Sequence, residues 1–170
     1  MALGTLVLLR HAKSAYPSGV TDHDRPLSPR GERDAVAAGL LLRDHRDAWL
    51  GTAAVVLVST ALRAQATWSL ASGSLPGIEA RSAPRLYEAS VSTLIDEVAP
   101  WIEAGSGVLV VAHNPGVEEL AAFLTGASDS DLRRTMRAKY PTAGIAVLQL
   151  HDARWSDTSA SLIDFLVPRG

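Results

Sequence analysis

The chain has 170 residues, a mass of 18.0 kDa and a formal net charge of −2. Hydrophobic residues make up 47% of the chain and charged residues 20%, proportions typical of a globular protein, which exclude a disordered tail or a collagen-like repeat. Cysteine is absent, and this excludes disulfide bonds, zinc–thiolate and iron–sulfur sites, and phosphatase chemistry that uses a cysteine nucleophile.

Three short apolar runs are rich in β-branched residues and continuous rather than alternating: Thr5–Leu9, Ala54–Val58 and Val108–Ala112. Continuous runs are typical of strands in a parallel sheet, because both faces of such a sheet are covered. Two later runs, Ala143–Leu150 and Leu162–Val167, predict partly antiparallel strands at one side of the same sheet.

Helix signals fill the first two gaps between these strands. Ser28 and Pro29 supply a cap and a first-turn proline for a helix over Glu32–Asp47. Thr60 is expected to cap a second helix, which continues to Ser72.

Two further helices are predicted in the middle of the chain. Ser90 is expected to cap a helix with a buried apolar face, in which Pro100 should introduce a kink or an end. Asn114 and Pro115 repeat the cap-plus-proline signal before a helix over Gly116–Leu124. Because no linker divides the chain, the alternation predicts one α/β domain over residues 1–170. We expect a three-layer sandwich with a mostly parallel central sheet and helices on both faces.

Reactive side chains follow the predicted strands at equivalent positions. In open α/β sheets, ligands bind where the strands end and the helices begin. The residues delivered there are Arg10, His11, Arg63, Glu88 and His113. Each has an ordinary explanation when taken alone, as a surface pair, a solvated first-turn arginine or the end of a strand. Their coincidence at one edge of a sheet predicts a functional site.

These residue types fit the transfer of a phosphoryl group. Two guanidinium groups can clamp a tetrahedral dianion, and helix N-termini add backbone donors. A histidine among fixed cations should have a lowered pKa and be neutral near pH 7, which makes it a nucleophile. In-line displacement mainly needs positioning and charge stabilisation, which arginines supply without a metal. Glu88 is then the candidate for protonating the leaving group.

Four segments, in this order, resemble the signature segments of the histidine phosphatase superfamily, which has the phosphoglycerate mutase-like fold. They are residues 8–12 (LLRHA), 24–31 (DRPLSPRG), 59–67 (STALRAQAT) and 111–116 (VAHNPG). Together they are most similar to those of SixA-type phosphohistidine phosphatases. The similarity extends from the first strand to about residue 144.

The resemblance implies a role for each matched residue. It makes His11 the phosphorylated nucleophile, places Glu88 at the proton-donor position, and assigns the phosphate pocket to Arg10, Arg63 and His113. It implies no cofactor and no metal. This sequence departs from the family at Ala12, which stands where the signature has glycine, so a positive φ at that position would be unfavourable.

The substrate is less constrained than the chemistry. Between Glu88 and His113 there is room for one helix and one strand, without the helical insertion that mutase-like relatives carry around the site. An open pocket suits a phosphorylated side chain on a protein. The leading hypothesis is therefore a metal-independent phosphatase that removes phosphate from phosphohistidine on a protein. A general small-molecule phosphomonoesterase and a phosphate- or phosphoprotein-binding module without turnover remain as alternatives.

Other polar residues are less informative. Asp24 and Arg25 are expected to border the pocket. The remaining histidines lack the mutual spacing of metal ligands, so no metal site is expected: His23, His45 and His151. A basic cluster is either a solvated helix face or a surface for an acidic partner: Arg133, Arg134, Arg137 and Lys139.

Neither the net charge nor the apolar runs point to nucleic acid or to a membrane. The first apolar run, Leu6–Leu9, has no basic leader and is far shorter than the roughly 20 residues that span a bilayer. We expect a cytoplasmic protein whose partner is a phosphorylated protein or a small phosphomonoester. The sequence leaves the oligomeric state open.

Overall fold

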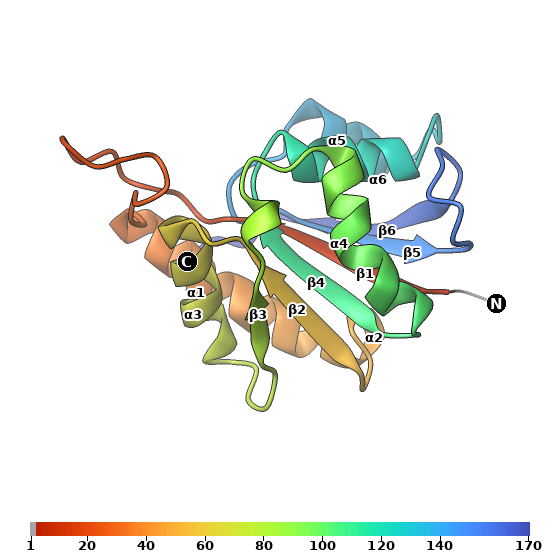
Figure 1. Cartoon of the computed structure of the whole chain (residues 1–170), viewed down its shortest axis with the longest axis horizontal. Coiled ribbons are helices and arrows are strands. Elements are labelled where there is room, and N and C mark those ends of the chain that lie inside the picture. Colours follow the sequence, from red (N-terminus) through yellow and green to blue (C-terminus); the bar gives the residue numbers. More distant parts are fainter. Residues whose placement is uncertain (1–2) are drawn as a thin grey trace.

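The computed structural model describes residues 3–170, in which a central sheet lies between two layers of helices (Figure 1). The strands lie side by side in the order β3-β2-β4-β1-β5-β6. Their bounds are β1 Gly4–Arg10, β2 Ala54–Val58, β3 Ala80–Ser82, β4 Gly107–Ala112, β5 Ile145–Leu150 and β6 Ala160–Leu166. Strands β1 to β4 pair in parallel, whereas β5 is antiparallel to both β1 and β6. The prediction of a mostly parallel sheet with antiparallel strands at one side is confirmed.

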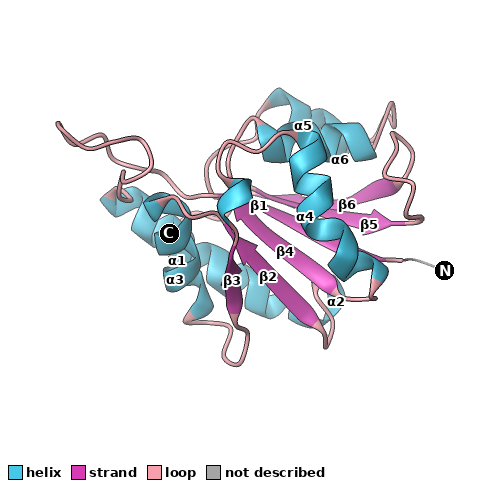
Figure 2. Cartoon of the chain, in the orientation of Figure 1, coloured by secondary structure: helices cyan, strands magenta, loops and turns pink. Residues whose placement is uncertain are grey.

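The helices cover both faces of the sheet (Figure 2). Their bounds are α1 Pro29–Asp44, α2 Arg46–Trp49, α3 Leu62–Ser72, α4 Val91–Glu103, α5 Gly116–Leu124 and α6 Asp131–Ala138, with a short 3-10 helix at Pro84–Leu86. Helices α1, α2 and α3 share one core with the sheet, and α4, α5 and α6 share the other. The predicted three-layer α/β sandwich is therefore confirmed.

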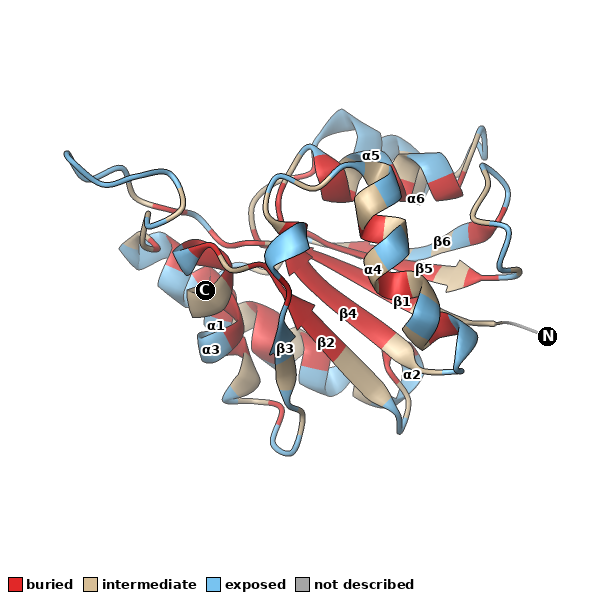
Figure 3. Ribbon diagram, in the orientation of Figure 1, coloured by how far each residue is buried: buried red, intermediate tan, exposed pale blue. Residues whose placement is uncertain are grey.

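Successive residues of each central strand point to opposite cores, because side chains alternate across a strand. In β1, Val7 and Leu9 belong to the core beneath α1 and α3. Leu6 and Leu8 belong to the core beneath α4 and α5. All four side chains are fully buried, and the central strands are buried along most of their length (Figure 3). Burial on both faces is the physical reason that the apolar runs are continuous.

Two of the predicted helix caps are present. Ser28 caps α1 by accepting from the backbone N–H of Gly31, and Ser90 caps α4 by accepting from that of Thr93. Helix α4 then runs through Pro100 to Glu103, so the proline does not end the helix. Position 100 is exposed, and water can therefore hydrogen-bond the backbone carbonyl that proline leaves without a donor.

The other two predicted caps are wrong, because neither side chain accepts from a backbone N–H at the start of its helix. Helix α3 begins after Ala61 without a side-chain cap, and the hydroxyl of Thr60 instead bonds the ring of His23 at 2.9 Å. Helix α5 begins after Pro115, and the amide of Asn114 donates to Glu118 at 2.8 Å.

Short or exposed elements account for the other differences. The helix expected over Glu32–Asp47 starts at Pro29 and stops at Asp44, and α2 follows after His45. The edge strand β3 was not predicted, since three residues carry no readable period. Within residues 3–170, none of the helices is long and apolar enough to cross a bilayer.

A close backbone contact anchors the loop that follows β1 to the start of α1. The N–H of Ser28 donates to the carbonyl of Lys13 at 2.8 Å, and Ser14 and Leu27 form an isolated bridge. A Cβ atom at Gly31 would lie 2.0 Å from the carbonyl oxygen of Lys13, so only glycine permits this approach. The tip of the loop between these contacts projects away from the sheet in Figure 1.

Candidate active site

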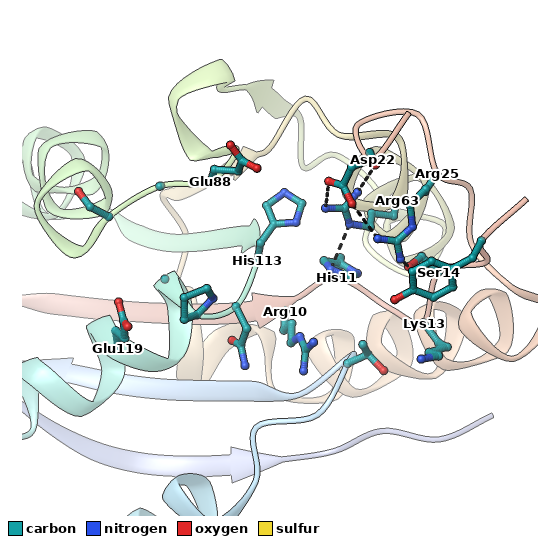
Figure 4. A pocket seen from close by; sticks show the side chains of 17 residues that line it. Arg10, His11, Lys13, Ser14, Asp22, Arg25, Arg63, Glu88, His113 and Glu119 are labelled. Atoms are coloured by element: carbon teal, nitrogen blue, oxygen red, sulfur yellow. Dashed lines mark hydrogen bonds and ion pairs between the residues drawn. The ribbon is translucent and has the colours of Figure 1, made fainter. Parts of the chain in front are cut away.

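The carboxyl ends of β1, β2 and β4 meet at one edge of the sheet, where a cavity of about 690 Å³ opens (Figure 4). Arg10 and His11 follow β1, and His113 follows the neighbouring strand β4. Arg63 is the second residue of α3, which starts after β2. All four of these predicted site residues line the cavity, although they are more than 100 positions apart at the extremes. The parallel register brings them together.

The ring of His11 is held in one tautomer by its two neighbours. Its Nδ1 lies 2.8 Å from the carbonyl oxygen of Ala12, and its Nε2 lies 3.2 Å from Nε of Arg63. Because Arg63 can only donate, Nε2 must accept, and the proton of the neutral ring is therefore on Nδ1. The lone pair that a nucleophilic imidazole needs is on Nε2.

Burial keeps this histidine uncharged. The His11 side chain is 7% exposed. Its pKa is lowered to about 3, first by burial and then by the nearby charges of His113, Arg63 and Arg10. The lowered pKa agrees with the sequence-based expectation, but its main cause differs. Desolvation lowers the pKa of His11 more than do the nearby cations that could be predicted from the sequence.

His113 lies beside His11, with 5.1 Å between the centres of the two rings. Its Nε2 is 2.7 Å from the hydroxyl oxygen of Ser59, the residue that follows β2. Burial, and after it the charge of Arg63, lowers the pKa of His113 to about 4. Both rings are therefore neutral near pH 7, and neither repels the other.

Arg10 contributes a guanidinium from the end of β1. One of its terminal nitrogens donates to the carbonyl of Tyr140 at 2.7 Å, which fixes its direction. Among the described residues 3–170, its Nε is buried and has no hydrogen-bond partner. Burial lowers the pKa of Arg10 from its ordinary value, but a guanidinium stays protonated near neutral pH. This side chain thus brings a fixed positive charge with a free donor.

Glu88 lies on the wall of the same cavity, after the 3-10 helix, and its side chain is exposed. Its backbone has a φ of 53°, in the left-handed region that is unfavourable for a residue with a side chain. In Figure 4 the ring of His113 is seen between Glu88 and His11. The hydrogen bonds of the His11 ring go to Ala12 and Arg63, and among the described residues none joins it to the Glu88 carboxyl group.

Asp22 is a cavity residue that the sequence reasoning missed. Its Oδ2 accepts from Arg63 at 3.1 Å and from the hydroxyl of Tyr87 at 2.7 Å, and its Oδ1 accepts from Arg25 at 2.8 Å. These hydrogen bonds hold the pKa of Asp22 well below its ordinary value, and the bond from Tyr87 has the largest effect. Arg25 lines the cavity as expected. Asp24 does not, because its carboxylate turns to the hydroxyl of Thr21.

Alanine at position 12 fits the site without strain. Ala12 is fully buried and packs against Leu27, Ala35 and Ala143. It is absent from the residues with positive φ among positions 3–170, and its N–H donates to the hydroxyl of Thr67 at 3.0 Å. The unfavourable backbone conformation that glycine would have relieved does not occur.

The basic cluster singled out in the sequence does not line the cavity. The basic cluster falls on α6 and the residue after it, and Arg134 is paired with Asp129 and Asp131. Within residues 3–170, no three His, Asp or Glu side chains converge in a way that could hold a metal ion.

Two histidines and two arginines, from the ends of β1 and β4 and from the start of α3, thus line one cavity at the carboxyl edge of a mostly parallel sheet. The chain belongs to the histidine phosphatase superfamily, since the family model described as branch 1 of that superfamily matches residues 6–96. The resemblance drawn from the sequence is confirmed. Membership and the SixA-like fold support a phosphatase of this superfamily.

Individual proteins extend the similarity over nearly the whole chain. An uncharacterized protein of Mycobacterium tuberculosis (strain ATCC 25618 / H37Rv) is 43% identical over 166 residues, covering 95% of this chain and 100% of the relative. The structure of a candidate phosphohistidine phosphatase SixA from Agrobacterium tumefaciens has a TM-score of 0.80 and 30% identity, covering 97% of this chain and 98% of that chain. A protein histidine phosphatase SixA complexed with tungstate has a TM-score of 0.77 and 23% identity, covering 96% and 97%, and supports the fold alone.

Proposed function

We propose that the protein is a metal-independent phosphatase that forms a covalent phosphohistidine on Nε2 of His11 and acts on phosphohistidine carried by another protein. The observation that carries this proposal is the state of the His11 ring. Nδ1 holds the proton against the carbonyl of Ala12, and Nε2 carries the lone pair, which accepts a hydrogen bond from Nε of Arg63. A neutral, fixed imidazole next to guanidinium groups meets the requirements of a nucleophile for phosphorus.

The reaction would proceed in two displacements. In the first, a bond forms between Nε2 of His11 and phosphorus while the bond between phosphorus and the substrate nitrogen breaks, and the departing imidazole takes a proton from water. In the second, a water oxygen bonds phosphorus and releases a proton to solvent, the bond to Nε2 breaks, and inorganic phosphate leaves. Arg10, Arg63 and His113 would contact the phosphoryl oxygens, whose negative charge is spread over three atoms during transfer. Glu88 would donate a proton when the leaving group is an alkoxide.

A substrate borne on a protein is supported by the shape of the rim. The stretch between Glu88 and His113 contains only α4 and β4, so no inserted element of that stretch covers the cavity. The cavity lining also includes Tyr16, which is 72% exposed. The guanidinium of Arg25 lies 3.7 Å above the Tyr16 ring. An exposed tyrosine is among the residue types that most often anchor protein partners.

The test is a panel of substrates with matched variants. The protein is incubated with a phosphohistidine-bearing protein, with an alkyl phosphate and with p-nitrophenyl phosphate, and acid-labile, base-stable phosphate on the enzyme is measured after rapid quenching. Turnover of the first substrate with a labelled enzyme intermediate is expected. His11→Asn should abolish both turnover and labelling, because no other group accepts the phosphoryl.

Tyr16→Ala separates the protein substrate from small ones. It should lower kcat/KM for the phosphoprotein about tenfold and leave that for p-nitrophenyl phosphate unchanged, whereas Val36→Ala, on the exposed surface of α1, should change neither. Broad hydrolysis of esters with no effect of Tyr16→Ala would instead establish a general phosphomonoesterase. Phosphate binding without turnover would establish a binding module.

A further inference from the structure

The guanidinium group of Arg63 is divided between two partners. Such a group has an end edge formed by Nη1 and Nη2, and a side edge formed by Nε and Nη2. On the end edge, Nη1 donates to the main-chain carbonyl of Asp22 at 2.6 Å and Nη2 donates to its carboxylate at 3.1 Å. On the side edge, Nε donates to Nε2 of His11 at 3.2 Å. One residue thus occupies the edge that faces away from the nucleophile.

Asp22 is itself fixed by contacts that do not involve Arg63. Tyr87 donates to its Oδ2 at 2.7 Å, and Arg25 donates to its Oδ1 at 2.8 Å. The adjacent carbonyl of His23 accepts from the N–H of Leu62, the first residue of α3, at 2.9 Å. The carboxylate is therefore anchored from the loop, by Arg25 (Figure 4), and from the segment before α4, by Tyr87, while α3 holds the backbone beside it. A carboxylate anchored in this way can set the orientation of the arginine that it binds.

We propose that Asp22 is a positioning residue of this site, which holds the end edge of Arg63 and so directs its side edge at the nitrogen that receives the phosphoryl group. The inference rests on the proposed function. Each terminal nitrogen of Arg63 carries two hydrogens, so Nη2 retains one for the side edge after it has bound Asp22. Nε and Nη2 together then form a fork beside Nε2 of His11. Such a fork matches two oxygens of a phosphoryl group.

A double-mutant cycle distinguishes this positioning role from a purely structural role, in which Asp22 only holds the loop after β1 in place. Turnover of p-nitrophenyl phosphate is measured for the wild type, Asp22→Ala, Arg63→Ala and the double variant. A positioning role predicts that Asp22→Ala lowers kcat about 10- to 100-fold, with KM changed less than threefold, because misplacement of about 1 Å at a reacting centre has effects of this size. It also predicts that the double variant is within threefold of Arg63→Ala.

The matched control is Asp24→Asn, in the same loop, whose carboxylate is 66% exposed and lies outside the cavity lining. It should retain the activity of the wild type. Asp22→Asn keeps an oxygen for Nη2 with little change of shape, so it serves if Asp22→Ala does not fold, and its loss of kcat should be smaller. Equal activity of Asp22→Asn, Asp22→Ala and the wild type would overturn the proposal, as would independent, multiplying losses in the double variant.

A second measurement does not depend on turnover. The ¹⁵N resonances of Nε of Arg63 and Nε2 of His11 report the hydrogen bond between these atoms. Both should shift, and the N–H of Arg63 should exchange faster, in the Asp22 variants but not in Asp24→Asn. If the wild type turns over no phosphorylated substrate, the proposed function fails, and these resonances alone decide the role of Asp22. Unchanged resonances would reject that role even in an active enzyme.

Discussion

Acidification should destabilise the protein through the two histidines of the site. Both have an ordinary pKa of 6.5, lowered mainly by burial to about 3 in His11 and about 4 in His113. Between those values and 6.5, the unfolded chain binds a proton on each ring that the folded chain does not bind. The stabilisation is therefore fully present above pH 6.5 and is lost as the pH falls toward the pKa values of the folded protein.

The expected size follows from the length of that pH interval. One pKa unit corresponds to about 1.36 kcal/mol, and pH 4.5 lies about two units below the ordinary value, so each histidine should remove about 2.7 kcal/mol of stability between pH 7 and pH 4.5. Because the rings are 5.1 Å apart, the two contributions are coupled, and their sum is at most about 5 kcal/mol. This is a large share of the stability of an ordinary domain.

Urea unfolding at pH 7.0 and pH 4.5, followed by the fluorescence of the four tryptophans, measures the effect. The quantity compared between proteins is the loss of unfolding free energy between the two pH values. In His11→Asn and in His113→Asn this loss should be smaller than in the wild type by about 2–3 kcal/mol. The control is His151→Asn, which replaces an exposed histidine far along the chain from the site.

The decisive comparison is His11→Asn against the wild type. If both lose the same stability on acidification, His11 takes up its proton equally in the folded and unfolded chains. Burial would then not keep the nucleophile neutral, and the physical basis of the proposed mechanism would be lost.

Three further outcomes test other parts of the structure. Glu88→Gln should lower kcat/KM for an alkyl phosphate about 100-fold or more and that for phosphohistidine by less than tenfold, because an alkoxide needs a proton donor more than an imidazole does. Chelation with EDTA should leave turnover unchanged, since arginine side chains surround the proposed phosphoryl position. Gly31→Ala should destabilise the protein by about 2 kcal/mol, or about 4–8 °C in Tm, because its Cβ would lie 2.0 Å from the Lys13 carbonyl oxygen.

Each of these three predictions can be contradicted by a stated result, and the two variants have matched controls. Glu79→Gln is a surface control for Glu88, and equal losses on both substrates would remove Glu88 from the role of proton donor. Loss of activity in EDTA that Mg²⁺ or Zn²⁺ restores would contradict a metal-independent reaction. For Gly31 the control is Gly73→Ala at the end of α3, where a Cβ meets nothing nearer than 3.4 Å and no destabilisation is expected. A Gly31 variant as stable as that control would show that the loop moves freely.

The sequence predicted the features that depend on long, regular patterns. Continuous apolar runs identified the central strands, because burial on both faces leaves no polar position in them. The parallel arrangement of those strands then placed Arg10, Arg63 and His113 at one edge. What was missed depends on contacts that no local pattern encodes. Asp22 is one acidic residue in a polar loop until that loop folds back onto α3.

Competition between neighbouring polar residues explains the errors at helix starts. Threonine is a common N-cap residue, but in the folded chain the hydroxyl of Thr60 is bound to the ring of His23. The prediction was also wrong about the main cause of the lowered pKa of His11, which is burial and not the nearby cations. Nearby cations can be guessed from sequence, whereas the degree of burial depends on how α3, β4 and the loop after β1 close around the rings.

The central position of β1 has a consequence for how activity is gained and lost. The N–H of His11 bonds the carbonyl of Ala112 in β4, while its own carbonyl accepts from Ala143, just before β5. The nucleophile is thus tied to segments about 100 and 130 positions away, whose pairing closes very long loops. Turnover should disappear in an all-or-none manner as denaturant is added, in step with tryptophan fluorescence. An activity assay of this protein therefore also reports whether the entire sheet has folded.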